Sequence, residues 1–203
     1  MKKQLIISVG REFGSGGHVI AETLAKRVGL PLYDRNILES IAQERNVDAK
    51  TLHRYDEVPR NILFSRRVRE YSTSAEENIA QMQFEYLKKK ADEGESFVVV
   101  GRCSETKLAG TPGLITIFVL GDIPVKTARI MKLHNLTEKE AKNMIEKQDR
   151  QRKMYHNYYV KGKWGDSRNY DLSINSSRMG IEKTADFLES YIRERIAESV
   201  QEA

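Results

Sequence analysis

Cysteine is almost absent from this chain of 203 residues, in which Cys103 is the only one. A single thiol excludes an internal disulfide framework and suits the reducing environment of the cytoplasm. Long apolar runs are also missing, because no stretch approaches the roughly 20 apolar residues that a membrane span needs. The apolar run before Gly10 is too short for a signal peptide, and no small-residue cleavage site follows it. These absences predict a soluble, cytoplasmic protein without a membrane partner.

The charge is not dominated by one sign. The net charge is +5 with 31% charged residues, and acidic and basic side chains are mostly interspersed. A nucleic-acid surface needs a basic stripe with exposed aromatic residues, and only residues 153–164 resemble one. A modest positive charge also suits a site that holds several phosphates. We therefore expect small-molecule nucleotide partners rather than nucleic acid, and a single domain with its own core.

Glycine is concentrated near the start of the chain. An apolar run over residues 4–9 stops at Gly10, a glycine-rich turn follows, and apolar residues then recur at helical spacing from Val19 to Val28. A helix that begins after such a turn offers free N–H groups and the positive end of its dipole to an anion, most often a phosphate. The candidate ATP-binding residues are Gly10, Arg11, Gly14, Ser15, Gly16, Gly17 and His18.

The match to the usual phosphate-loop pattern, G-x-x-x-x-G-K-[ST], is incomplete. Gly17 stands where the lysine belongs, His18 stands where the hydroxyl belongs, and Gly10 lies one residue too far from Gly16. The alternative is a tight turn that only joins a strand to a helix. We favour the phosphate loop because four glycines and two serines occur within residues 8–17.

The rest of the chain alternates between strand and helix patterns. Besides residues 4–9, the expected strands are 30–34, 97–101, 114–121 and 170–175, which predicts an α/β fold with a parallel five-stranded sheet flanked by helices. Two capping boxes, at residues 74–77 and 137–140, open helices, and another helix follows Asp122 and Pro124. Ligands in such sheets bind at the carboxyl ends of the strands, which is where Asp34 and Arg102 are expected.

A basic run is the second strong feature. Lys147 and Arg150 share a helix face, while Arg152 points elsewhere. Arginine suits phosphate because its planar fork donates two parallel hydrogen bonds. The run leads into an aromatic, glycine-containing segment that is expected to close as a lid; the alternative is a solvated basic face. Similarly, Arg102 is either a surface residue or a phosphate contact, and Asp34 is either a helix N-cap or an acceptor contact.

The chain resembles the cytidylate kinase-like family of small phosphate-loop kinases along nearly its whole length. The resemblance rests on the order of five motifs. These are residues 10–18, Tyr33-Asp34-Arg35, Gly101-Arg102, Asp149-Arg150-Gln151-Arg152 and residues 170–175. It implies a phosphate-loop NTPase core over residues 1–34, 96–150 and 167–203, a helical monophosphate-binding lobe over 35–95 and a lid over 151–166.

The resemblance also implies a reaction, in which the γ-phosphoryl group of ATP passes to CMP or dCMP with Mg²⁺. The implied acceptor-binding residues are Asp34, Arg35, Arg102 and Asp149, and the catalytic cations are Arg150, Arg152 and Lys147. Positioning and electrostatics perform such transfers, without a covalent intermediate. We expect no protein metal site, since His18, His53, His134 and His156 lack metal-ligand spacing; Mg²⁺ would be held mainly through water.

Four departures from true cytidylate kinases keep alternatives open. Gly17 and His18 replace a lysine and a small polar residue, while Val100 and Cys103 replace acids on either side of the Gly-Arg pair. Either Arg11 and Lys147 substitute for the missing lysine or turnover is poor. The alternatives are a kinase of another small acceptor on the same fold and a nucleotide-binding sensor that no longer catalyses.

Overall fold

The central sheet has five parallel strands. The computed structural model describes residues 4–45, 48–53, 67–68, 71–72 and 75–201. Within them the strand order is β2-β5-β1-β6-β7, and every neighbouring pair is parallel. The predicted α/β class with a five-stranded parallel sheet is therefore confirmed. The strands are β1 (Ile6–Arg11), β2 (Leu32–Tyr33), β5 (Phe97–Val100), β6 (Leu114–Leu120) and β7 (Leu172–Asn175).

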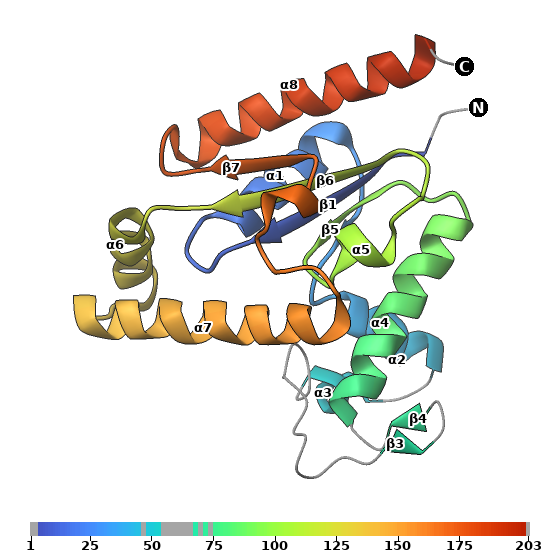
Figure 1. Cartoon of the computed structure of the whole chain (residues 1–203), viewed down its shortest axis with the longest axis horizontal. Helices are drawn as coiled ribbons and strands as arrows, with labels where there is room; N and C mark the ends of the chain where they lie inside the picture. Colours follow the sequence, from blue (N-terminus) through green and yellow to red (C-terminus); the bar gives the residue numbers. More distant parts are fainter. Residues whose placement is uncertain (1–3, 46–47, 54–66, 69–70, 73–74, 202–203) are drawn as a thin grey trace.

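Helices cover both faces of this sheet (Figure 1). On one face α1 (Gly17–Val28) and α8 (Gly180–Gln201) pack against the strands through side chains such as Leu24 and Leu188, which are fully buried. On the other face lie α2 (Ile37–Arg45), α3 (Ala49–His53) and α4 (Ala75–Asp92), packed around Phe97. The central strands are consequently buried on both sides, as their continuous apolar sequences require.

Two helices extend beyond the carboxyl ends of the strands. They are α6 (Ile123–His134) and α7 (Glu138–Tyr159), which pack together through Ile130, Ala141 and Ile145. The predicted capping box of α7 is present, because the Thr137 hydroxyl accepts from the Glu140 N–H while the Glu140 carboxylate accepts from the Thr137 N–H. The other predicted box includes Ser74, which lies outside the described residues. The smaller elements are α5 (Ser104–Lys107), the 3₁₀ turn η1 (Ser167–Asn169) and the hairpin of β3 (Arg67–Val68) with β4 (Tyr71–Ser72).

Two boundaries differ from the sequence-based expectation. Helix α7 continues without a break to Tyr159, so the segment predicted as a lid, residues 151–166, begins inside a helix. Asp34 is not the N-cap of α2, because its carboxylate accepts from the Asn36 N–H within the preceding turn and the helix begins at Ile37. Among the described helices, none has the length and apolar character that a membrane crossing needs.

Candidate active site

Three arginines converge where the strands end. Arg11 at the end of β1, Arg102 just after β5 and Arg152 on α7 line one small cavity of about 30 Å³. The Arg152 guanidinium donates to the Arg11 carbonyl at 3.2 Å. Converging guanidinium groups suit the oxygens of a phosphate. The remaining lining residues are Gly10, Gly101, Cys103, Glu105, Tyr155, His156, Trp164 and Tyr170.

The backbone after β5 has an unusual conformation that places Arg102. Arg102 and Cys103 have φ values of 61° and 52°, in the left-handed region that side-chain-bearing residues rarely adopt. Such a strained backbone persists only where the contacts around it hold it in place, and it is often found at functional sites. The Arg102 side chain is turned inward and is only 2% exposed. Arg102 is therefore buried at the end of a strand and is not a surface residue.

The glycine-rich loop joins β1 to α1. Gly14 and Gly16 both have φ near +80°, a conformation natural only for glycine. A Cβ at Gly16 would lie 2.8 Å from Ile181, and one at Gly17 would lie 2.6 Å from the Cβ of Arg11. These glycines are thus required by close packing within the protein itself, in addition to any close approach of a ligand.

Several donors of this loop bind acceptors within the protein. The Phe13 N–H donates to the Asp149 carboxylate at 2.6 Å, and the Gly17 N–H donates to the Ser15 hydroxyl at 3.3 Å. Arg129 donates to the Gly14 carbonyl and fixes the loop against α6. The Phe13 and Gly17 amides are thus bonded within the protein, whereas the sequence alone led us to expect a loop with free amides.

A buried lysine that we did not predict as a site residue lies beside the loop. Lys126 on α6 is 2% exposed, and its Nζ donates to Glu12 at 3.0 Å and to Asp149 at 2.8 Å. The Glu12 carboxylate also accepts from the Gly121 N–H at 3.1 Å. The sequence does contain one sign that Lys126 is buried, because it lies four residues before Ile130, on the apolar stripe of its helix.

A second pair that we did not predict lies deeper in the cavity. The His156 Nε2 and a Glu105 carboxylate oxygen are 2.8 Å apart, and both side chains are buried. The bond joins α5, which follows the Arg102 turn, to α7, which carries Arg152. Burial, together with the nearby Glu105 carboxylate, raises the pKa of the adjacent Tyr170 hydroxyl, so that group stays protonated at neutral pH.

Comparison with known proteins identifies the family. The model of the cytidylate kinase-like family matches residues 6–178. The chain belongs to this family. A search of curated proteins gives no match. An uncharacterized protein from Eubacterium ventriosum ATCC 27560 is 38% identical, with a TM-score of 0.75 over 94% of this chain and 99% of that one.

More distant structures share the fold. A shikimate kinase from Bacteroides thetaiotaomicron is 13% identical with a TM-score of 0.55, over 93% of this chain and 98% of that one. A gluconokinase from Sinorhizobium meliloti 1021 is 12% identical with a TM-score of 0.57, over 100% of this chain and 99% of that one. Membership of the cytidylate kinase-like family, on a fold shared with kinases, supports phosphoryl transfer to a nucleotide or another small molecule.

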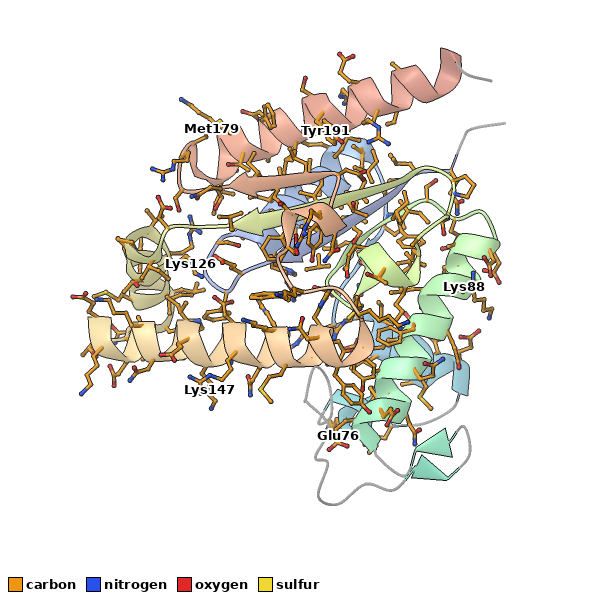
Figure 2. All side chains as sticks on the ribbon, viewed as in Figure 1. Glu76, Lys88, Lys126, Lys147, Met179 and Tyr191 are labelled. Carbon is orange, nitrogen blue, oxygen red and sulfur yellow. The ribbon has the colours of Figure 1, made fainter. Side chains whose placement is uncertain are left out.

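The structure does not bring every candidate residue of this family member to the cavity. Lys147 is exposed on the outer side of α7, and Arg150 is exposed and pairs with Glu146 at 2.6 Å (Figure 2). Arg35 is also exposed. The reason is helical geometry, since Arg152 and Asp149 share the inward face of α7 whereas Lys147 and Arg150 lie on the outward face.

His18 and Asp34 lie together at a separate point of the same edge. The His18 ring is 3.6 Å from the Asp34 carboxylate and 3.5 Å from Glu22, and its side chain is 48% exposed. The arrangement connects the first turn of α1 with the end of β2. It leaves His18 turned toward carboxylates rather than toward the loop.

Basic side chains near the glycine-rich loop suit the oxygens of a phosphate. Within the described part of the chain, no three His, Cys, Asp or Glu side chains are placed to hold an ion. The cations near the loop include Arg11, Lys126, Arg129 and Arg152. Next to the loop lies a wider groove of about 550 Å³, which is lined by Ile123, Ile145 and Trp164 and by five charged residues that include Asp149 and Arg150. Mg²⁺ that arrives with ATP would neutralise phosphate charge.

Proposed function

We propose that this protein transfers the γ-phosphoryl group of ATP to a nucleoside monophosphate, CMP or dCMP above all, giving CDP or dCDP. The observation that carries the proposal is the convergence of Arg11, Arg102 and Arg152 on one cavity beside a glycine-rich loop. In this proposal the loop and its neighbouring cations bind ATP with Mg²⁺. Arg102 and Asp149 hold the acceptor, and Arg152 stabilises the charge that develops during transfer.

A different acceptor is the second candidate, and one specific observation favours it. Val100 and Cys103 are 1% and 3% exposed, so apolar groups occupy the positions where true cytidylate kinases have acids. Cys103 lines the arginine cavity, where an acid would be able to bind a base or an ion. Its replacement removes polar contacts by which a pyrimidine monophosphate would be selected.

An acceptor panel tests both candidates. Purified protein with ATP and Mg²⁺ would be offered CMP, dCMP, UMP, AMP, GMP, shikimate and gluconate, with ADP release as the readout. We expect the highest kcat/KM with CMP or dCMP. Turnover only with a non-nucleotide acceptor would support the second candidate, and tight ATP binding without turnover on any acceptor would identify a sensor.

A further inference from the structure

Gly17 stands where the usual phosphate-loop pattern has its lysine, and the structure has no room for a side chain there. A Cβ built on Gly17 would lie 2.6 Å from the Arg11 Cβ and 3.2 Å from the Val119 Cβ, and real Cβ atoms essentially never approach as closely as the first of these distances. Because the stem of Arg11 fills this space, no side chain fits at residue 17 without moving β1. A cation for the phosphates has to come from outside the loop.

Lys126 reaches the loop from α6. Its stem runs beside Gly14, since a Cβ built on that glycine would lie 3.3 Å from the Lys126 Cβ. Its Nζ is held by two carboxylates, those of Glu12 and Asp149. Figure 2 labels Lys126 on the side of α6 that faces the sheet. A charged group at 2% exposure is expensive to bury, so its placement against the loop calls for a reason.

The Asp149 carboxylate is bound in the way that a phosphate is bound in such loops. One of its oxygens accepts from the Phe13 N–H of the loop at 2.6 Å, and the other accepts from the Lys126 ammonium at 2.8 Å. A backbone amide and a lysine that converge on one anionic group are the ligand set of a phosphate oxygen pair. Asp149 therefore occupies an anion site made by the loop and α6.

We propose that Lys126 is the phosphate-binding cation that replaces the loop lysine, and that the Asp149 carboxylate holds this anion site until the polyphosphate chain of a nucleotide displaces it. The inference rests on the proposed function only in taking a nucleoside triphosphate as the ligand. Displacement follows because a phosphate at this site takes the same two donors that now bind Asp149, the Phe13 N–H and the Lys126 ammonium. Released from the loop, Asp149 becomes available to the acceptor.

The exchange links the two halves of the site. Asp149 and Arg152 lie three residues apart on the inward face of α7, and Arg152 donates to the Arg11 carbonyl at the base of the loop. A polyphosphate that removes Asp149 from the Phe13 amide frees this face of α7 to shift. Binding of a polyphosphate in the loop thereby controls the position of Arg152. No further helix or strand is needed for this coupling.

Binding of inorganic tripolyphosphate, without acceptor and without turnover, tests the proposal by calorimetry. Asp149→Asn keeps the shape of the side chain and removes its charge, so we expect affinity for tripolyphosphate and for ATP to rise about 5- to 10-fold. Lys126→Met should lower it roughly 10²-fold, as expected for loss of a charge-assisted contact, and Lys126→Arg should retain most of it. Lys132→Met, on an exposed position of the same helix, is the matched control.

The outcomes separate this proposal from the proposed function. Unchanged or weaker tripolyphosphate binding in Asp149→Asn, or wild-type affinity in folded Lys126→Met, overturns the role of the two residues even if CMP is phosphorylated. Tighter binding in Asp149→Asn, with no turnover by the wild-type protein on any acceptor, supports the anion site and refutes the kinase assignment. If Lys126→Met fails to fold, Asp149→Asn decides alone, because it leaves the Glu12 pair of Lys126 in place.

Discussion

Arg152 reaches the cavity from α7, where it meets Arg11 and Arg102. Its guanidinium lies over the Phe13 ring, with 5.5 Å between the guanidinium carbon and the ring centroid, and donates to the Arg11 carbonyl, so two contacts orient it in the ligand-free structure. Preorganised donors of this kind act mainly on the transition state. Lysine would keep the charge but lose the planar fork that binds two oxygens at once.

We expect Arg152→Lys to lower kcat roughly 10²-fold, about 3 kcal/mol, with a smaller change in KM for ATP. Steady-state kinetics with the best acceptor of the panel measures both constants. The control is Arg193→Lys on α8, whose exposed side chain pairs with Glu189. If Arg152→Lys keeps full kcat with every working acceptor, the residue is a structural contact of the loop.

For Gly17, the direction of the stability change caused by alanine shows whether the space beside this residue is open or filled. Its φ is ordinary for a helix, so alanine would stabilise the first turn of α1 by up to about 1 kcal/mol if the space were open. Because a Cβ there would meet Arg11, we expect Gly17→Ala to destabilise the fold by about 1–3 kcal/mol in urea unfolding, as overpacking does. Gly29→Ala is the comparison, since it meets nothing within 4 Å and reports only the strain of its positive φ.

At the scale of elements, the start of α7 depends on its capping box. We expect Thr137→Ala to lower the free energy of unfolding by about 1 kcal/mol. Hydrogen bonds from the Thr137 side chain and backbone lower the pKa of Glu140 below its ordinary value. A carboxyl group with a lowered pKa stabilises the fold above the pKa of the unfolded chain and loses this effect as the pH falls.

The difference between wild type and Thr137→Ala should accordingly shrink below about pH 4, near the ordinary pKa of glutamate. Urea unfolding at pH 7 and at pH 3.5 measures it. Thr23→Ala serves as the control, because Thr23 lies within α1 and its hydroxyl donates to the Val19 carbonyl without capping the helix. An equal effect of Thr137→Ala at both pH values would remove Glu140 from the cap.

The segment between α7 and β7 provides its own probe, since Trp164 is the only tryptophan in the chain. Its ring packs edge-on against Phe118 with 5.5 Å between centroids, and it lines both the arginine cavity and the neighbouring groove. The cavity of about 30 Å³ has to widen for a phosphate to enter. Movement of residues 160–166 relative to the sheet is the proposed consequence.

We therefore expect Trp164 fluorescence to change when ATP and the acceptor are added together, and hydrogen exchange of residues 160–166 to slow. Helix α7 should keep its own protection, because it continues unbroken to Tyr159. The measurement is a fluorescence titration followed by hydrogen exchange with and without ligands. Identical spectra and identical exchange would show that this segment is not a lid.

The whole molecule is stabilised chiefly by the packing of helices on the sheet. Leu188 on α8 is fully buried against the face that α1 also covers, while its neighbour Phe187 is 48% exposed. We expect Leu188→Ala to lower the free energy of unfolding by about 2–5 kcal/mol through lost burial and the cavity left behind. Phe187→Ala should change it much less, and a loss of similar size in urea unfolding would contradict this account of the core.

Much of the fold could be read from local patterns. The apolar runs at residues 97–101 and 114–121 correspond to β5 and β6, and the capping box at Thr137 opens α7 as expected. Ala185, Leu188 and Ile192 recur at helical spacing in the sequence, and all three are fully buried on α8. These features depend on periodicity and on backbone donors within a few residues, so they are visible without knowledge of the rest of the chain.

The candidate site was harder to predict. Arg102 and Arg152 lie together with the loop, whereas Lys147 and Arg150, chosen from the same basic run, are exposed on the outer side of α7. Their outward direction follows from the phase of a helix whose inner face is set by packing against α6. The buried pair of Glu105 and His156 gave no sequence signal, because the two residues lie 51 positions apart.

The sequence alone determined the class of fold, the position of the glycine-rich loop and the family, because burial periodicity and turn chemistry are local properties. Only the tertiary structure decided which charges meet. The Phe13 amide and the Asp149 carboxylate are separated by 136 positions, and Lys126 lies 114 positions from Glu12. Such contacts depend on how α6 and α7 dock beyond the sheet, and docking is decided by the fit of apolar side chains on several elements at once.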